Sequence, residues 1–324
     1  MLPMPANENA FITEIIPAAS VDDLLMHSIL IVSGAHLNFD DDADGTAQKA
    51  TLCHYSSLIR LLRAEFIELK DSDVRHDLTT HFGLGLELYS YLIVTNCLTP
   101  YGLLSERMFS MDHFITSLNS LSPYPTFGIM FAGFHGLFEL IPQTSLLFAK
   151  RLVEQEAGVI DPSPGCVELH DTIQSRLHNW NDAQAATHKF HDKGSIEYVS
   201  KALRHSLEIY LRAAMQGSSI PSPETISEIQ SHVDIILDSG HKLDDSQWTA
   251  ILMWPCLIAC SCTTQQDMQE LLSRGLRSSR YRMKHSIRAS NLLQRLWDDP
   301  DPRMYGPYGL YLAISKYDTT FATL

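Results

Sequence analysis

The chain has 324 residues, of which 45% are hydrophobic and 19% charged, a composition that fits a globular protein with a substantial core. Its 38 acidic residues outnumber 24 basic ones, which gives a net charge of −14 at pH 7. Because a basic surface supplies most of the affinity for phosphates, this charge argues against direct binding of nucleic acid. The basic run from Arg274 to Arg288 is interpreted as a solvated helical face and its turn.

The cysteines and the apolar segments indicate where the chain works. The six cysteines form no paired CxxC array and most lie among apolar residues, as reduced, buried thiols do. The first residues show no basic-then-apolar signal sequence, and no apolar stretch reaches the ~18 residues that would span a membrane. We therefore expect an intracellular protein, nuclear or cytoplasmic, that makes no contact with a membrane.

Apolar residues recur with a helical period from about residue 21 to residue 298. Ser20 and Asp23 resemble a capping box at the start of the first predicted helix. Pro142 is expected to bend the helix in which it lies, because it lacks a backbone N–H. In the first half of the chain, helices are predicted over about residues 24–35, 46–69, from 73 toward 100, 103–120 and 126–150.

The stretch Gly158–Gly165 is the clearest loop in the sequence. Ser222 before Pro223 predicts a capped helix start. Further helices are predicted over about residues 166–185, 194–216, 223–239, 246–261, 264–277 and 281–298. Since no strand pattern or fixed repeat occurs, we predict an all-α fold of about ten to twelve helices. These helices would form one large bundle-like domain over 1–324, with a weak internal boundary at 158–165.

Motifs that hold nucleotides, metals or catalytic serines are missing from the sequence. GxxxxGK[ST], GxGxxG after a strand, GxSxG and HExxH do not occur. The thiols of Cys256–Cys262 lack the second ligand cluster that structural zinc requires, and His188, His191 and Asp192 lie in a polar segment. We expect neither a metal site nor a cofactor.

The segment Trp248–Cys262, WTAILMWPCLIACSC, contains no charged residue and is apolar on every side. Such a helix should be wholly buried, and Pro255 should bend it. Bent, buried helices rich in Met and Trp often line ligand cavities in helical bundles, although a plain core helix would show the same pattern. The residues predicted to contact a ligand are Trp254, Met253, Phe134 and Trp248.

Short degenerate motifs occur along the chain in a characteristic order. They are Leu24–Leu30, Ser33–Leu37, Arg176–Trp180, Leu207–Leu211, Trp254-Pro255 with Ile258–Cys260, Gln265–Leu276 and Leu292–Trp297. In this order, over about residues 12–300, the chain resembles the fungal-specific transcription factor regulatory domain of the sterol-regulator-like branch. That domain is the C-terminal module of many fungal binuclear zinc-cluster regulators.

The resemblance implies an all-α fold, a fungal origin, and a role in sensing a small molecule or a partner. It offers no invariant catalytic residues to transfer. The zinc-cluster regulators carry six clustered cysteines with basic residues among them, and nothing similar stands here before Cys53. We expect either a regulatory domain separated from its DNA-binding part or a natural protein that never had one.

Three functions fit these observations. The favoured one is a regulatory domain that binds a small apolar molecule. The second is a cofactor-independent enzyme of fungal secondary metabolism, a cyclase, isomerase or pericyclase, with His135, Glu87, Tyr89 and Tyr210 as candidate catalytic residues. The third is a protein-interaction scaffold or co-regulator, and a homodimer is left open.

Overall fold

The computed structural model describes residues 16–37, 49–50, 52–58, 60–61, 87, 90–91, 94, 97, 118–122, 131, 133–181, 193–243, 249–278 and 284–317. Among these residues the regular elements are helices and none is a strand, so the all-α prediction is confirmed. The chain divides into two compact units. The first comprises Met1–Leu92, Asn119–Met130 and Leu324, and the second comprises Ile93–Leu118 and Phe131–Thr323. The single domain over 1–324 stays a prediction, and the loop at 158–165 lies inside the second unit.

The first unit contains α1 (Ile16–Ala19) and α2 (Asp23–Leu37), which pack against each other. Asp22 caps α2, because its Oδ1 accepts from the backbone N–H of Leu25 at 2.9 Å. The capping box predicted from Ser20 is therefore wrong. The Ser20 hydroxyl instead donates to the carbonyl at the start of the same turn, which leaves Asp22 as the nearest side-chain acceptor for α2.

The core of the first unit forms around Ala19 and Leu25, with Met26 and Ile29 packed on it. Residues 52–58 are helical, in agreement with the helix predicted over 46–69. His54 from this helix lies against His27 of α2, with 2.9 Å between the two Nδ1 atoms.

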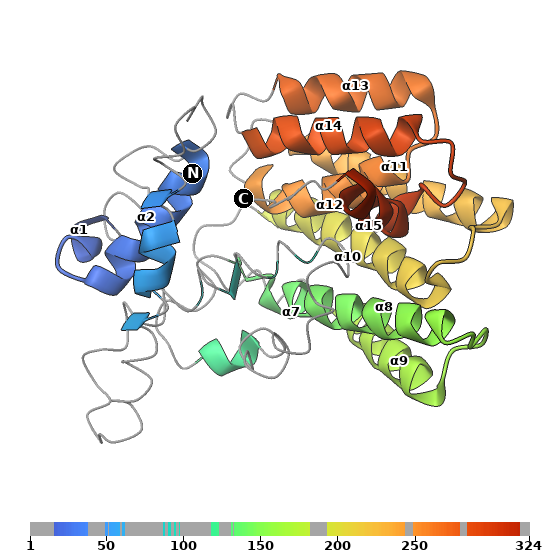
Figure 1. Ribbon diagram of the computed structural model, residues 1–324, viewed down its shortest axis with the longest axis horizontal. Helices are drawn as coiled ribbons and strands as arrows, with labels where there is room; N and C mark the ends of the chain where they lie inside the picture. The colour runs from blue at the N-terminus through green and yellow to red at the C-terminus, as the bar shows by residue number, and fades with distance from the viewer. Residues whose placement is uncertain are drawn as a thin grey trace. The chain divides into compact units, whose positions relative to one another are not determined.

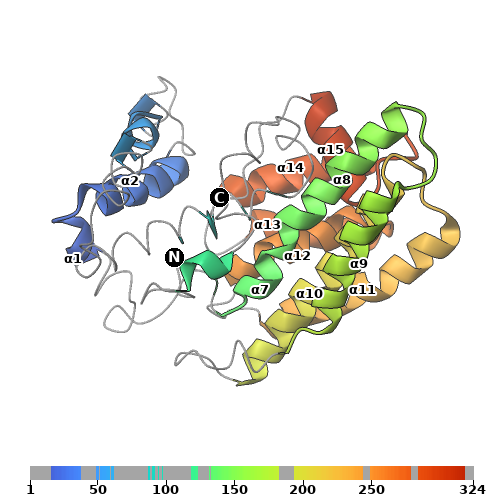
Figure 2. The same cartoon turned by 90° about the horizontal axis from the view of Figure 1, so that it is seen from below.

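The second unit is a bundle in which α10 is central (Figures 1 and 2). α10 contacts α8, α9, α11, α12 and α15, whereas α13 packs on α14 at the outside of the bundle. The helices of this unit are α7 (His135–Phe138), α8 (Leu140–Glu156), α9 (Pro164–His178), α10 (Lys193–Gln216), α11 (Pro223–Lys242), α12 (Thr249–Ser261), α13 (Gln266–Arg277), α14 (Lys284–Asp298) and α15 (Gly306–Tyr317). A short 3₁₀ turn at Leu118–Leu121 lies where the chain passes from the second unit to the first.

Two of these helices begin at a Ser-Pro pair. The Ser163 hydroxyl accepts from the N–H of Cys166, and the Ser222 hydroxyl accepts from the N–H of Thr225. In both cases proline occupies the first helical turn, where its missing N–H costs no hydrogen bond. The start predicted at Ser222 is confirmed.

Two features near the ends of the bundle differ from the expectation. Pro142 does not bend a long helix, since α8 starts at Leu140 and Pro142 lies in its first turn, where no intrahelical donor is needed. The helical hydrogen-bond pattern is interrupted between α7 and α8 at Glu139, whose backbone stays in the right-handed helical region. Helix α15 begins at Gly306, after residue 298, where the last predicted helix ends.

No helix in the part of the chain that the structure describes is long and apolar enough to cross a membrane.

Candidate functional site

The residues predicted to contact a ligand lie in the second unit wherever they are described. Trp254 is 1% exposed in α12, Met253 beside it is half-buried, and Phe134 is fully buried just before α7. Trp248 lies outside the described residues. Phe134 packs toward Trp180, with 6.4 Å between ring centroids, so its described ring contact is at the α7–α9 side rather than at Trp254.

Helix α12 owes its position to its composition. Its sequence TAILMWPCLIACS contains no charged side chain, and the helix contacts α10, α11, α14 and α15. A helix without a polar face gains free energy by burying every side, at about 25 cal/mol for each Å² of apolar surface removed from water. This burial places Trp254 in the interior of the unit.

A series of aromatic ring contacts leads from Trp254 through the second unit. Tyr210 of α10 meets Trp254 edge to face, with 5.6 Å between ring centroids. Phe148 of α8 meets Tyr210 in the same way at 6.1 Å, and Tyr308 of α15 lies 6.2 Å from Phe148. We call Phe148, Tyr210, Trp254 and Tyr308 the aromatic cluster. Each of its rings comes from a different helix, so successive ring contacts link α12, α10, α8 and α15.

Tyr210 and Trp254 are among the candidate residues predicted from the sequence, whereas Phe148 and Tyr308 are not. Aromatic residues are common on buried helical faces, and the sequence spacing does not show which of them meet in space. The signal that could have pointed to Phe148 is the apolar stripe of α8, on which Phe148 lies at helical spacing from Ile141 and Leu152.

The polar atoms of Tyr210 and Trp254 are buried with their rings. Burial raises the pKa of Tyr210, whose hydroxyl lies near Ser145 and Cys97, so the phenol stays protonated at neutral pH. The indole Nε1 of Trp254 is buried and has no hydrogen-bond acceptor among the described residues. An unpaired buried donor costs about 1–3 kcal/mol.

A second tryptophan beside α12, Trp297, has the hydrogen-bond acceptor that Trp254 lacks in the described part of the chain. The Nε1 of Trp297 in α14 donates to the carbonyl of Cys260 at 3.2 Å. Pro255 cannot donate to the carbonyl of Ile251, so α12 also lacks one helical hydrogen bond one turn from this region. Trp254 is therefore a buried donor in a part of the helix whose backbone pattern is already interrupted.

The thiols of α12 and its C-terminal end are poor candidates for chemistry. Burial raises the pKa of Cys256 to about 11 and that of Cys262 to about 12, and it also raises the pKa of Cys260. Because the thiolate is the reactive and metal-binding form, these protonated thiols are weak nucleophiles and weak ligands. Among the described residues, no group of three or more His, Cys, Asp or Glu side chains is arranged to hold a metal ion.

The four candidate catalytic residues do not form a described group. Glu87 is buried and belongs to the first unit, whereas His135 and Tyr210 belong to the second. Tyr89 lies outside the described residues. His135 opens α7 and Tyr210 lies in the middle of α10, and catalysis by these residues stays a prediction.

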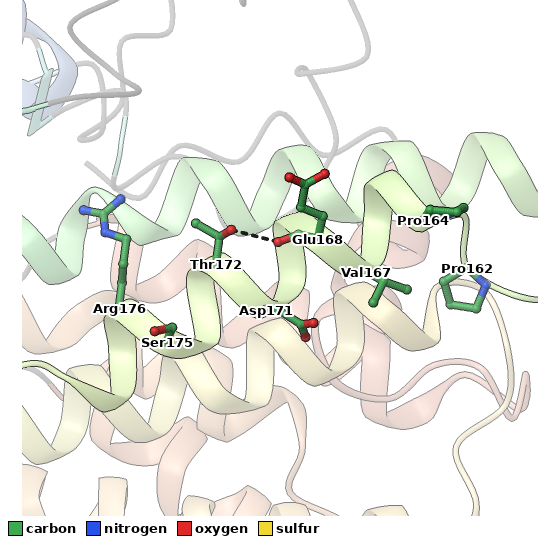
Figure 3. A pocket seen from close by; sticks show the side chains of 8 residues that line it. All are labelled: Pro162, Pro164, Val167, Glu168, Asp171, Thr172, Ser175 and Arg176. Atoms are coloured by element: carbon green, nitrogen blue, oxygen red, sulfur yellow. Dashed lines mark hydrogen bonds between the residues drawn. The ribbon is translucent and has the colours of Figure 1, made fainter.

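The surface of the second unit is hollowed at two described places. A shallow groove runs along the outer side of α9, from Pro162 and Pro164 to Arg176 (Figure 3). A crevice of about 20 Å³ lies between the end of α10 and the start of α15, beside Gln216 and Tyr305, which is room for about one water molecule.

The basic run at the end of the sequence lies partly within the described residues. Arg274, Arg277 and Arg288 are exposed on α13 and α14. Arg277 binds the side chains of Ser290 and Asn291, which ties α13 to α14. An exposed face of this kind agrees with the solvated helical surface expected from the sequence.

Comparison with known proteins identifies one family. A family model described as the fungal-specific transcription factor domain matches residues 106–306, which is more than half of the chain and lies mostly in the second unit. The motifs at Leu24–Leu30 and Ser33–Leu37 lie outside the matched range. No curated protein and no solved structure matches the chain.

Proposed function

The chain belongs to the family of fungal-specific transcription factor domains, and its general role is regulatory; from this premise we propose that its second unit senses a small, largely apolar molecule beside Trp254. The observation that carries the proposal is the buried Nε1 of Trp254, which has no acceptor among the described residues. A bound molecule that offers an acceptor would remove the cost of that unpaired donor.

The aromatic cluster restricts the chemistry of such a molecule. Tyr210 meets Trp254 edge to face, and α12 supplies no charge, so a molecule bound beside Trp254 would be neutral and mostly apolar. An indole N–H only donates, so the molecule must present a carbonyl, ether or hydroxyl oxygen to it. A neutral metabolite with one oxygen acceptor meets both conditions.

The position of α12 would let a bound molecule change the packing of the other helices of the second unit. A molecule next to Trp254 would contact or displace a helix that packs on α10, α11, α14 and α15. Binding changes the balance between two arrangements only by the difference in its affinity for them. We infer that the occupied and empty arrangements differ in the packing of α12.

The charge of the chain favours a sensing role over direct contact with DNA. With a net charge of −14, these 324 residues would repel phosphates rather than neutralise them. Membership in a transcription factor family supports an intracellular location, and we propose that the protein is nuclear.

The test compares two tryptophan variants by native mass spectrometry of protein purified from the organism that makes it. Trp254→Phe removes the unpaired donor and keeps an aromatic ring, whereas Trp297→Phe removes a donor that already binds Cys260. The wild type and Trp297→Phe should retain the same small molecule, and Trp254→Phe should retain about five- to tenfold less, the loss of one hydrogen bond. Equal retention by the two variants, or no retained molecule in any of the three proteins, would contradict the proposal.

A further inference from the structure

The connection between α8 and α9 exposes a run of apolar side chains. Ile160 is 86% exposed, Val159 is 43% exposed, and Val167 in the first turns of α9 is 40% exposed. Pro162 and Pro164 lie between them and line the groove along α9 (Figure 3). Single exposed apolar residues are common, but several of them in one short connection form a surface that can bind a partner.

A buried arginine of α8 holds the backbone of this connection. Arg151 of α8 is 2% exposed, and its guanidinium donates to the carbonyl oxygens of Val159 and Ile160. It also donates to the carbonyl of Met215 at the end of α10, with 3.3 Å between Nε and O. An arginine is buried only where its donors are satisfied, so the loop carbonyls are part of what holds this side chain.

A carboxylate beside Arg151 fixes the second half of the connection. Glu154 accepts from Arg151 at 3.0 Å, from the backbone N–H of Ser163 at 3.4 Å and from the thiol of Cys166 at 3.1 Å. Burial alone would raise the pKa of Glu154, but the hydrogen bonds from Ser163, Cys166 and Arg151 lower it to about 2. Two prolines stiffen the same segment. The exposed apolar side chains therefore stand on a loop whose backbone is held in one conformation.

The charges around these side chains are mostly negative. The exposed acidic residues of this region are Glu156, Asp161, Glu168 and Asp171, and Glu168 and Asp171 line the groove itself (Figure 3). The nearby cations are Lys150 and Arg176. Arg176 lines the same groove and pairs with Glu139, and Asp171 pairs with its neighbour His170. The apolar series thus has an acidic border.

We propose that this surface, the α8–α9 strip of Ile160, Pro162, Pro164, Val167, Glu168 and Asp171, docks a protein segment that carries Lys or Arg beside an apolar side chain. An apolar anchor surrounded by a charged rim is the usual arrangement of a binding hot spot. A loop that is already ordered loses little conformational freedom on binding. A second copy of this chain fits poorly, because both copies carry a charge of −14 and would repel each other.

Three synthetic 15-residue peptides, each labelled with a fluorophore, test the partner's chemistry against the full chain. One alternates Lys with Leu, one alternates Glu with Leu, and one alternates Lys with Ser. Fluorescence anisotropy should show binding of the Lys/Leu peptide that weakens as salt is raised, and at least tenfold weaker binding of the other two. Equal binding of the Glu/Leu peptide, or no binding of the Lys/Leu peptide, would overturn the proposal.

Matched variants place the binding on the strip. Ile160→Ser should lower the affinity for the Lys/Leu peptide about tenfold. The double change Glu168→Gln with Asp171→Asn should lower it about threefold and make binding less dependent on salt. The controls lie on α13, where Leu271 is 55% exposed. They are Leu271→Ser and the double change Asp267→Asn with Glu270→Gln, and both should bind the Lys/Leu peptide within twofold of the wild-type affinity. Because Ile160 is almost fully exposed, its variant should fold normally, which circular dichroism checks.

Self-association is the competing occupant. Analytical ultracentrifugation of the wild type and of Ile160→Ser should give the same sedimentation at each concentration. A dimer in the wild type that Ile160→Ser abolishes would assign the strip to a second copy and overturn the proposed basic partner. An equal loss of peptide affinity in the strip variants and the α13 variants would also overturn the proposal, because the attraction would then come from the charge of the whole chain.

Discussion

Helices α12 and α13 follow each other in the chain and have 13 and 12 residues, yet they are stabilised in opposite ways. α12 has no charged side chain and contacts four other helices, whereas α13 packs on α14 and none of its residues is buried. A helix that is apolar on all sides depends on every neighbour, and an amphipathic helix depends on one. The second unit can therefore tolerate changes on α13 that it cannot tolerate on α12.

The largest expected difference comes from one substitution made in both helices. Leu257 in α12 is 2% exposed and Leu271 in α13 is 55% exposed. Leu257→Ala should lower the free energy of unfolding by about 2–5 kcal/mol, because it removes buried apolar surface and leaves a cavity. Leu271→Ala should lower it by less than about 1 kcal/mol. Urea denaturation of both variants measures the two values, and equal losses would remove the distinction between the helices.

The next largest effect concerns two tryptophans that are both associated with α12. Without a bound molecule, Trp254→Phe leaves a cavity in the core that lowers the free energy of unfolding, and the removal of a buried donor that has no acceptor offsets about 1 kcal/mol of this loss. Trp297→Phe should lower it by about 1 kcal/mol, since the hydrogen bond to Cys260 is lost. Chemical denaturation of ligand-free protein gives both values. A loss in Trp254→Phe of more than about 3 kcal/mol would exceed the cavity cost less this offset and would mean that the Trp254 N–H has a partner in the empty protein.

The same contrast explains which parts of the fold the sequence could predict. The ends of α10 and α11 were predicted to within three residues, because their apolar period is long and the Ser222 cap is explicit. α15 was missed, since its first turn contains Gly306, Pro307 and Gly309, which are ordinarily signs of a loop. These residues start a helix here because its apolar face has α12 and α14 to pack against.

The candidate site was predictable in part for the same physical reason. The uncharged sequence of α12 was enough to predict that Trp254 is buried. Its partners on other helices, Phe148 and Tyr308, depend on tertiary packing that no local pattern records. Arg151 was not predicted at all, because charged residues are rarely buried and only the structure shows the loop carbonyls that receive it.

The interface between α10 and α11 differs from α12 in its response to pH. His205 and His232 lie there with 2.8 Å between their Nδ1 atoms. Burial, together with the charges of His232, Arg204 and Lys201, lowers the pKa of His205 to about 4; burial also lowers that of His232, beside Glu208, Arg212 and Glu228. In the unfolded chain a histidine titrates near 6.5, so between pH 6.5 and 4 the unfolded state binds more protons. Stability should therefore fall as the pH falls through this range.

The measurement is the change in the free energy of unfolding between pH 7.5 and pH 5.0. After allowance for the half-exposed position of the pair, His205 should account for about 1 kcal/mol of the loss. His205→Gln should show a loss smaller by that amount, whereas a change at the exposed His241 of α11, His241→Gln, should follow the wild type. The α12 thiols cannot produce this dependence, since the pKa of Cys256 is raised to about 11. An identical pH dependence in His205→Gln would exclude the pair as its source.

The smallest effect tests how freely the outer face of α13 can change. A Cβ added at Gly275 would meet no atom within 4 Å, and the glycine lies inside the helix. Gly275→Ala should raise the free energy of unfolding by about 0.5–1 kcal/mol, because alanine loses less backbone entropy on folding. Gly309 in α15 is the matched control, since a Cβ there would lie 2.7 Å from the backbone of Met304, and Gly309→Ala should destabilise the protein. Thermal unfolding of the two variants should give shifts of opposite sign, and a loss of stability in Gly275→Ala would show that the outer face of α13 is packed against something.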